Sequence, residues 1–148
     1  EFWHLTHDPH GKPALHNEGS APLPIGISHA HSRDDTWAAV ARWTDRRHHG
    51  GVDLSDVHDP RIEHVAPRVM GAEELDRWRG QEAWAWGAKE AMFKGYGPSL
   101  DYRTEAVLTQ LTTSPSGNEG ELEGLVRGRA WTGRWLLVRD GLLMVWSC

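Results

Sequence analysis

Three residues with ionisable side chains could take part in chemistry on a substrate that carries phosphate groups. They are Asp53, Glu90 and Lys94. Asp53 interrupts the strand-forming run Gly51-Val52-Asp53-Leu54, where aspartate is disfavoured. Glu90 and Lys94 are four residues apart, so they share one face if they lie on a helix. An acid on a strand and an acid on a helix could together hold one Mg²⁺ ion, which proteins bind with about one or two carboxylates and the phosphates of a substrate.

Each of these residues also has an ordinary structural interpretation. Asp53 could satisfy a turn at the end of a strand. Glu90 and Lys94 could form an exposed ion pair worth about a few tenths of a kcal/mol. Lys89 alone would be a solvated cation, and His29 a structural histidine. Zinc is not expected, because the ten histidines and the one cysteine show no HxxxH, HExxH or CxxC spacing.

A helical region is predicted to carry Glu90 and Lys94. Residues 82–96 are dense in Ala, Glu, Lys, Met and Trp, which favours one long helix. Upstream, Pro60 suits a first helical turn, and Pro67 is expected to end or kink that segment. Another helix is predicted before Gly80, which interrupts the pattern.

Strand patterns flank the helical region on both sides. Residues 36–43 favour a strand, with 52–54 as its hairpin partner across a polar loop. Asp140-Gly141 is a strong signal for a tight hairpin. Further strands are predicted at 25–29, 106–111, 122–127, 135–139 and 142–146. The fold class is therefore α+β, with helices between an N-terminal hairpin and a C-terminal antiparallel sheet.

Length and composition narrow the class of protein. The chain has 148 residues, 39% of them hydrophobic and 25% charged, which is typical of a globular domain with a genuine core. No apolar run approaches the roughly 20 residues of a membrane helix, and no basic-then-apolar leader opens the sequence. The net charge of -5 disfavours nucleic-acid binding, and Cys148 alone forms no internal disulfide. We expect a cytoplasmic protein with neither a membrane nor a nucleic-acid partner.

Four short segments occur in a characteristic order. They are Gly11-Lys12-Pro13, Ile27-Ser28-His29, Gly51-Val52-Asp53-Leu54 and Trp86-Gly87-Ala88-Lys89-Glu90-Ala91-Met92-Phe93-Lys94. In this order they resemble the signature of the 4'-phosphopantetheinyl transferase superfamily, whose patterns are GKP, (I/S)SH, G(I/V)D and W(S/G)xKEAxxK. The last pattern is the specific one, and it is matched at every key position. Members of this superfamily move the phosphopantetheine arm of coenzyme A onto a serine of a carrier protein.

The resemblance implies a role for each matching residue. Asp53 and Glu90 match the acids that bind Mg²⁺, with Mn²⁺ as an alternative ion, together with the coenzyme A diphosphate. Glu90 also matches the proposed general base for the carrier serine, and Lys94 the lysine that stabilises or protonates the leaving 3',5'-ADP. Contacts with the phosphates of coenzyme A are implied for Lys12, Ser28, His29, Lys89 and Lys94.

The chain departs from the family pattern at one metal position. The family usually shows a glutamate two residues after the motif aspartate, and this chain has Ser55 there. Asp56 does not replace it, because side chains alternate along a strand and only Ser55 shares the face of Asp53. A serine hydroxyl is a weak metal ligand, so this departure implies water in the site, a lower metal affinity or a loss of activity.

The extent of the match is the second departure. The resemblance is to the long, surfactin-synthetase-activating type, in which two similar halves pack as a pseudo-dimer and coenzyme A binds between them. Residues 1–45 correspond to the C-terminal part of the first half-domain, and 50–148 to the second half-domain with the metal and catalytic motifs. The chain thus resembles the last two-thirds of a long-form enzyme.

The leading hypothesis is a Mg²⁺-dependent transferase that acts on an acyl or peptidyl carrier protein of fatty acid or secondary-metabolite biosynthesis. One alternative is a non-catalytic member or fragment that binds coenzyme A or a carrier protein. A remote alternative is an unrelated α+β metal-dependent phosphohydrolase.

Overall fold

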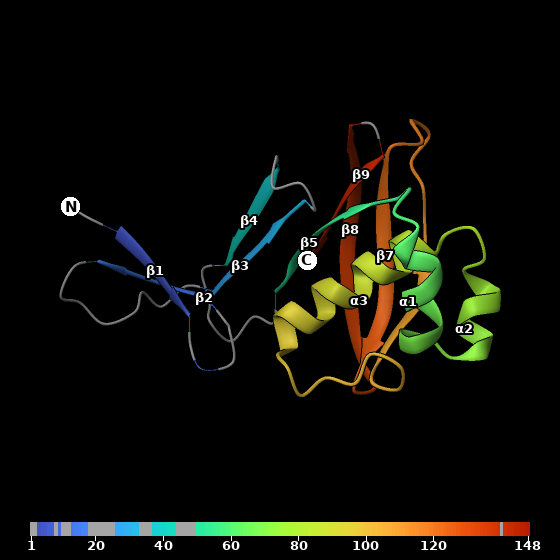
Figure 1. Cartoon of the computed structure of the whole chain (residues 1–148), viewed down its shortest axis with the longest axis horizontal. Coiled ribbons are helices and arrows are strands. Elements are labelled where there is room, and N and C mark those ends of the chain that lie inside the picture. Colours follow the sequence, from blue (N-terminus) through green and yellow to red (C-terminus); the bar gives the residue numbers. More distant parts are fainter. Residues whose placement is uncertain are drawn as a thin grey trace.

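The computed structural model describes residues 3–7, 9, 13–17, 26–32, 37–43, 50–139 and 141–148. Its elements form a mixed α+β architecture in which every strand pairing is antiparallel (Figure 1). In chain order they are β1 (Trp3–His7), β2 (Pro13–Asn17), β3 (Gly26–His31), β4 (Ala38–Trp43), β5 (Val52–Asp56), α1 (Arg61–Val69), α2 (Ala72–Arg77), α3 (Glu82–Tyr96), β6 (Ala106–Leu111), β7 (Glu119–Val126), β8 (Arg129–Arg139) and β9 (Leu142–Ser147).

A five-stranded sheet in the order β5-β9-β8-β7-β6 forms the main body, and the helices lie against one of its faces (Figure 1). The alternation along β7 explains this packing, because exposed and buried residues succeed one another over its whole length. Small alanines line the buried side of α3, so the helix can approach the sheet closely. Core residues from both layers include Ala85, Ala88, Ala91, Met92, Leu122, Val126, Trp135, Leu143 and Val145.

Two separate hairpins, β1–β2 and β3–β4, precede the main sheet (Figure 1). The β3–β4 hairpin contacts β5, the strand that carries Asp53. Ser28 ties them together, because its buried hydroxyl accepts a hydrogen bond from the backbone N–H of Val52 over 3.0 Å. The β3–β4 hairpin is therefore attached to the edge of the sheet where β5 lies, and β2 contacts β3.

Several sequence predictions are confirmed. The structure has a helix from Glu82 to Tyr96 and a strand from Ala106 to Leu111, with the predicted bounds. The last two strands, β8 and β9, pair as an antiparallel hairpin at the predicted turn. The broad α+β class also agrees with the structure.

Two local predictions are wrong. The strand at 38–43 does not pair with 52–54, because β4 pairs with β3 and β5 pairs with β9. In the observed register Val52 faces Trp146 and Leu54 faces Met144, which brings large apolar side chains together across the pair. Pro67 does not end α1, which continues to Val69, since a proline in the last turn removes only one hydrogen-bond donor there. The other expected effect, a kink at Pro67, stays a prediction.

The structure bears in part on the expectation that the protein has no membrane partner, and it does not test the predicted division into half-domains. No helix in the described part of the chain is long and apolar enough to cross a membrane. The division into half-domains 1–45 and 50–148 stays a prediction. Residues 46–49, between the two predicted units, lie outside the described residues, as do the last two residues of the first unit.

Candidate functional site

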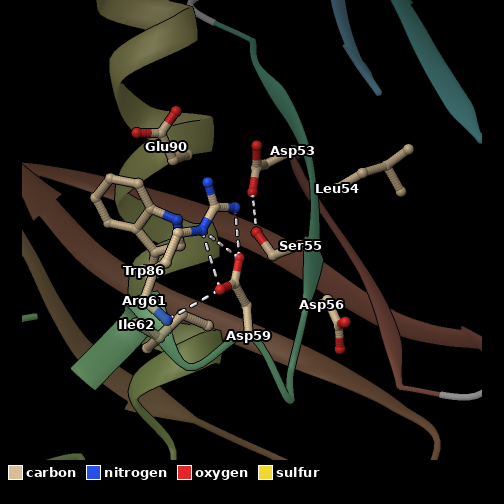
Figure 2. Close-up of a pocket in the computed structure, with 9 residues that line it drawn as sticks. All are labelled: Asp53, Leu54, Ser55, Asp56, Asp59, Arg61, Ile62, Trp86 and Glu90. Carbon is tan, nitrogen blue, oxygen red and sulfur yellow. Dashed lines mark hydrogen bonds and ion pairs between the residues drawn. The ribbon is translucent and has the colours of Figure 1, made fainter. Parts of the chain in front are cut away.

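A cavity of about 210 Å³ opens beside β5 and α3, and it contains the two acids singled out in the sequence (Figure 2). The residues lining it come from β5, from the turn and first residues of α1, and from α3. They are Asp53, Leu54, Ser55, Asp56, Asp59, Arg61, Ile62, Trp86 and Glu90.

The backbone of β5 positions Asp53 at this cavity. Asp53 and Ser55 point toward α3, whereas Leu54 points away from it (Figure 2). Gly51 permits the close approach of the strand to the helix, because a Cβ atom there would lie 2.0 Å from the carbonyl oxygen of Ala91. The glycine of the GVD segment therefore serves to bring Asp53 near the face of α3 that carries Glu90.

Both carboxylate oxygens of Asp53 are engaged. Lys94 Nζ donates to Oδ1 over 2.7 Å, and Ser55 Oγ donates to Oδ2 over 2.5 Å. The lysine thus joins helix to strand, and the ordinary interpretation of Glu90 and Lys94 as an exposed ion pair within one helix is wrong in this respect. Asp53 itself is only 6% exposed, so its negative charge is compensated within the protein.

Glu90 has a different partner. The hydroxyl of Tyr102 donates to Glu90 Oε1 over 2.6 Å. Burial raises the pKa of Glu90 above its usual range, because the charged form loses water; the nearby charge of Asp53 raises it further, and the bond from Tyr102 opposes this shift. Burial and the charge of Glu90 raise the pKa of Tyr102 far above its usual range, so the phenol stays protonated and is the donor.

Sequence reasoning missed Tyr102 and Arg61. Tyr102 follows α3 in a loop, at no helical spacing from Glu90. Arg61 reaches the cavity from α1 and forms a two-pronged ion pair with Asp59, with Nε–Oδ2 and Nη2–Oδ2 distances of 2.9 and 2.5 Å. The hydrogen bond that Arg61 donates to Asp59 raises the pKa of Arg61. A local pattern in the sequence could have indicated Arg61. Asp59, two residues before it, accepts the backbone N–H of Arg61, as in an Asx turn.

Lys89 lies elsewhere, in the protein interior. Its side chain is 0% exposed and forms an ion pair with Glu74 Oε2 at 2.8 Å. Its ammonium also donates to the carbonyl oxygens of Tyr102 and Ala106. These acceptors bind the ammonium in the interior, and Lys89 does not line the cavity. The expected contact between Lys89 and a phosphate of coenzyme A is therefore corrected. In this structure the residue is a structural cation, although burial lowers its pKa.

The remaining predicted contacts come from the N-terminal part of the sequence. Ser28 is buried against β5, and its hydroxyl accepts the N–H of Val52, so it supports the strand next to Asp53 without lining the cavity. Lys12 lies outside the described residues, and so does the side chain of His29, whose backbone belongs to β3. The structure therefore brings together Asp53, Ser55, Glu90 and Lys94, and it leaves Lys12 and His29 untested.

Four acidic side chains line the cavity, and two of them, Asp53 and Glu90, come from the motifs and are the candidates to hold a metal ion. Among the described residues, no three His, Cys, Asp or Glu side chains gather as a metal-binding group. Asp53 and Glu90 nevertheless fit a magnesium site of the substrate-completed kind, because Mg²⁺ is usually bound by about one or two carboxylates, water and phosphates. Each ionised carboxylate has about four lone-pair positions, so the bonds to Lys94, Ser55 and Tyr102 leave oxygen lone pairs for such an ion.

Comparison with known proteins adds no family assignment. No family model matches the chain, and no curated protein sequence matches it either. The function must therefore be argued from the cavity and from the motif residues around it.

Proposed function

We propose that this chain belongs to the 4'-phosphopantetheinyl transferase superfamily and carries the metal-binding and catalytic part of an enzyme that acts on coenzyme A and a carrier protein. The observation that carries the proposal is that an acid from β5 and an acid from α3 line one cavity, and that a lysine from α3 binds the first of these acids. These residues are Asp53, Glu90 and Lys94, which two separate motifs supply. The α+β architecture, with α3 packed beside β5, supports a fold of the same superfamily.

Asp53 and Glu90 would hold the Mg²⁺ or Mn²⁺ ion, which neutralises charge on the coenzyme A diphosphate when it is bound. The described protein side chains then handle the protons and the remaining charge. Glu90 accepts the proton of the carrier serine hydroxyl.

The proposed transfer of the phosphopantetheine group forms one bond and breaks one bond. The serine oxygen forms a bond to the phosphorus that bears the pantetheine arm, and the bond from this phosphorus to the oxygen of 3',5'-ADP breaks. Lys94 lies one helical turn from Glu90 and binds Asp53, so its ammonium is placed to offset the charge that develops on the leaving 3',5'-ADP. Such chemistry needs positioning and charge neutralisation more than covalent help.

A second candidate is coenzyme A binding without transfer. Ser55 favours it, because this hydroxyl, and not a third carboxylate, lies beside Asp53 and donates to it. A site with two acids holds a divalent cation more weakly than one with three. Binding of coenzyme A without any product on a carrier protein would be its signature.

Transfer of a fluorescent phosphopantetheine arm from labelled coenzyme A to apo acyl and peptidyl carrier proteins tests the proposal. Glu90→Gln and Lys94→Ala should each lower turnover by about 100-fold or more, because both act on charge that develops during the reaction. Lys94→Ala should lower turnover more than coenzyme A affinity. Arg79→Ala is the matched charge control, since Arg79 pairs with Asp76 on the exposed surface.

The possible outcomes separate the candidate functions. Near-wild-type turnover in both variants would leave Lys94 and Glu90 with only structural roles, and the proposal would be wrong. Labelled coenzyme A that binds without reaching any carrier would favour the non-catalytic candidate. Release of phosphate without a carrier protein would favour a phosphohydrolase.

A further inference from the structure

Tyr102 is fixed in place by stacking on the helix that carries Glu90. Its ring lies nearly parallel to the ring of Phe93, with centroids 4.9 Å apart and an interplanar angle of 17°. It also lies nearly parallel to Trp86, at 5.7 Å and 19°. Both aromatic residues belong to α3, and Trp86 also lines the cavity. The direction of the tyrosine hydroxyl is therefore set by the same helix that places Glu90.

The loop around Tyr102 is held independently. The side chain of Asp101 accepts the backbone N–H groups of Arg103 and Thr104 over 2.9 and 2.8 Å. The carbonyl oxygen of Tyr102 accepts the buried ammonium of Lys89 over 2.7 Å. Because contacts fix both the ring and the backbone of Tyr102, its hydroxyl has a defined position. The hydrogen bond to Glu90 therefore costs little additional conformational entropy.

The bond from Tyr102 distinguishes the two oxygens of Glu90. Oε1 accepts the hydroxyl at 2.6 Å, whereas no described residue donates to Oε2. Since Glu90 lines the cavity, it can bind a cation through Oε2 while Oε1 stays hydrogen-bonded. Ligating carboxylates in metal sites are themselves held by hydrogen bonds of this kind, and removing the donor weakens metal binding.

We infer that Tyr102 is a positioning residue that binds Oε1 of Glu90 and thereby presents Oε2 to a divalent cation as a single-oxygen ligand. This inference rests on the proposed function, because it takes Glu90 as a metal ligand. Tyr102 itself touches neither the substrate nor the ion. It acts through Glu90, and the two rings of α3 give its hydroxyl the required direction.

Titration of the protein with Mn²⁺ alone tests the inference, with the EPR signal of the free ion as the readout. Tyr102→Phe keeps the ring and its stacking partners but removes the donor. Its Mn²⁺ affinity should fall by about 10- to 100-fold, as expected when a hydrogen bond to a metal ligand is removed. Tyr96→Phe is the matched control, because Tyr96 is the other tyrosine of the chain and does not line the cavity. Its Mn²⁺ affinity should equal that of the wild type.

A second measurement uses the fact that the chain has two tyrosines. Protein labelled with 3-fluorotyrosine should give one ¹⁹F resonance for each, and Tyr96→Phe assigns them. Addition of Mg²⁺ should shift the Tyr102 resonance and leave that of Tyr96 in place. This readout needs neither enzymatic activity nor a substitution of Tyr102.

The outcomes separate failure of the inference from failure of the proposed function. One outcome is that Mn²⁺ binds the wild type, binds Glu90→Gln more weakly, and binds Tyr102→Phe as tightly as the wild type or more tightly. In that case the positioning role of Tyr102 is wrong, and the proposed metal site is supported. If the wild type, Asp53→Asn and Glu90→Gln bind Mn²⁺ alike, the proposed metal site is wrong, and the inference falls with it. A Tyr102 resonance whose chemical shift does not change when Mg²⁺ is added would also overturn the inference.

Discussion

The acids at the cavity are held by residues from different parts of the chain. Asp53 is bound by Lys94 and Ser55, and Glu90 by Tyr102. The ordered motifs predicted that Asp53 and Glu90 would meet, because both match acids of one metal site in the family that the sequence resembles. They could not indicate which atoms would bind, since Lys94 is four residues from Glu90 along the helix yet pairs with Asp53.

Glu90→Gln should stabilise the folded protein at neutral pH but not in acid. Burial raises the pKa of Glu90 in the folded state, so this state keeps a proton where the unfolded chain has lost it. The free energy of unfolding of the wild type therefore falls as the pH rises from the unfolded pKa through the folded one. Glutamine does not titrate, and its amide oxygen can still accept the bond from Tyr102. Urea unfolding of both proteins at about pH 4 and pH 8 measures the difference. An equal difference at both pH values would contradict the prediction.

Ser55→Glu should strengthen binding of Mg²⁺ and Mn²⁺. The serine hydroxyl points toward α3 and donates to Asp53 (Figure 2). A carboxylate on the same strand face adds a hard oxygen ligand and a negative charge, so we expect an affinity about tenfold higher, measured calorimetrically. Ser55→Gln is the control for side-chain size without charge. A weaker site in Ser55→Glu would mean that Ser55 belongs to a rearranged site that the family pattern does not describe.

At the scale of elements, helices and hairpins that depend on neighbouring residues could be predicted from the sequence. Pairings between strands that are distant in the sequence could not. The composition of 82–96 was sufficient for α3, and Asp140-Gly141 for the β8–β9 hairpin, because both depend on neighbouring residues. The pairing of β5 with β9 joins Asp53 to Val145, far apart in the sequence, and no local turn specifies it. The same reason explains why Tyr102 was missed, since a loop residue reaches Glu90 only through the tertiary fold.

Gly51→Ala should separate β5 from α3 and weaken both the fold and the site. The added Cβ atom would lie 2.0 Å from the carbonyl oxygen of Ala91, which is backbone and cannot move aside alone. We expect a loss of about 1–3 kcal/mol or more in unfolding free energy, as for other overpacked interiors, together with weaker Mn²⁺ binding. Gly71→Ala is the matched control, because a Cβ atom there meets nothing within 4 Å. Thermal and urea unfolding measure both, and equal stabilities would show that strand and helix do not need this close contact.

At the scale of the whole molecule, two long-range attachments hold the cavity together. On one side, β5 pairs with β9, so the strand bearing Asp53 depends on nearly the last residues of the chain. On the other side, Lys89 and Glu74 join α3 to α2, and Glu74 Oε1 accepts the backbone N–H of Leu108 in β6. A buried ion pair of the neighbouring residue Lys89 therefore anchors the helix that presents Glu90.

Lys89→Ala should reveal whether this lysine serves the fold or a ligand. Its side chain is 0% exposed, so its removal leaves the carboxylate of Glu74 buried without its cation, which typically costs about 3–5 kcal/mol in unfolding free energy. The double variant Lys89→Met with Glu74→Gln removes the unpaired charge and keeps an acceptor for the backbone N–H of Leu108, so it should recover part of that stability. Urea unfolding of the wild type, Lys89→Ala and the double variant measures both effects. A Lys89→Ala variant with wild-type stability but weakened binding of coenzyme A would contradict the structural role and restore the contact with phosphate that the motif resemblance implies.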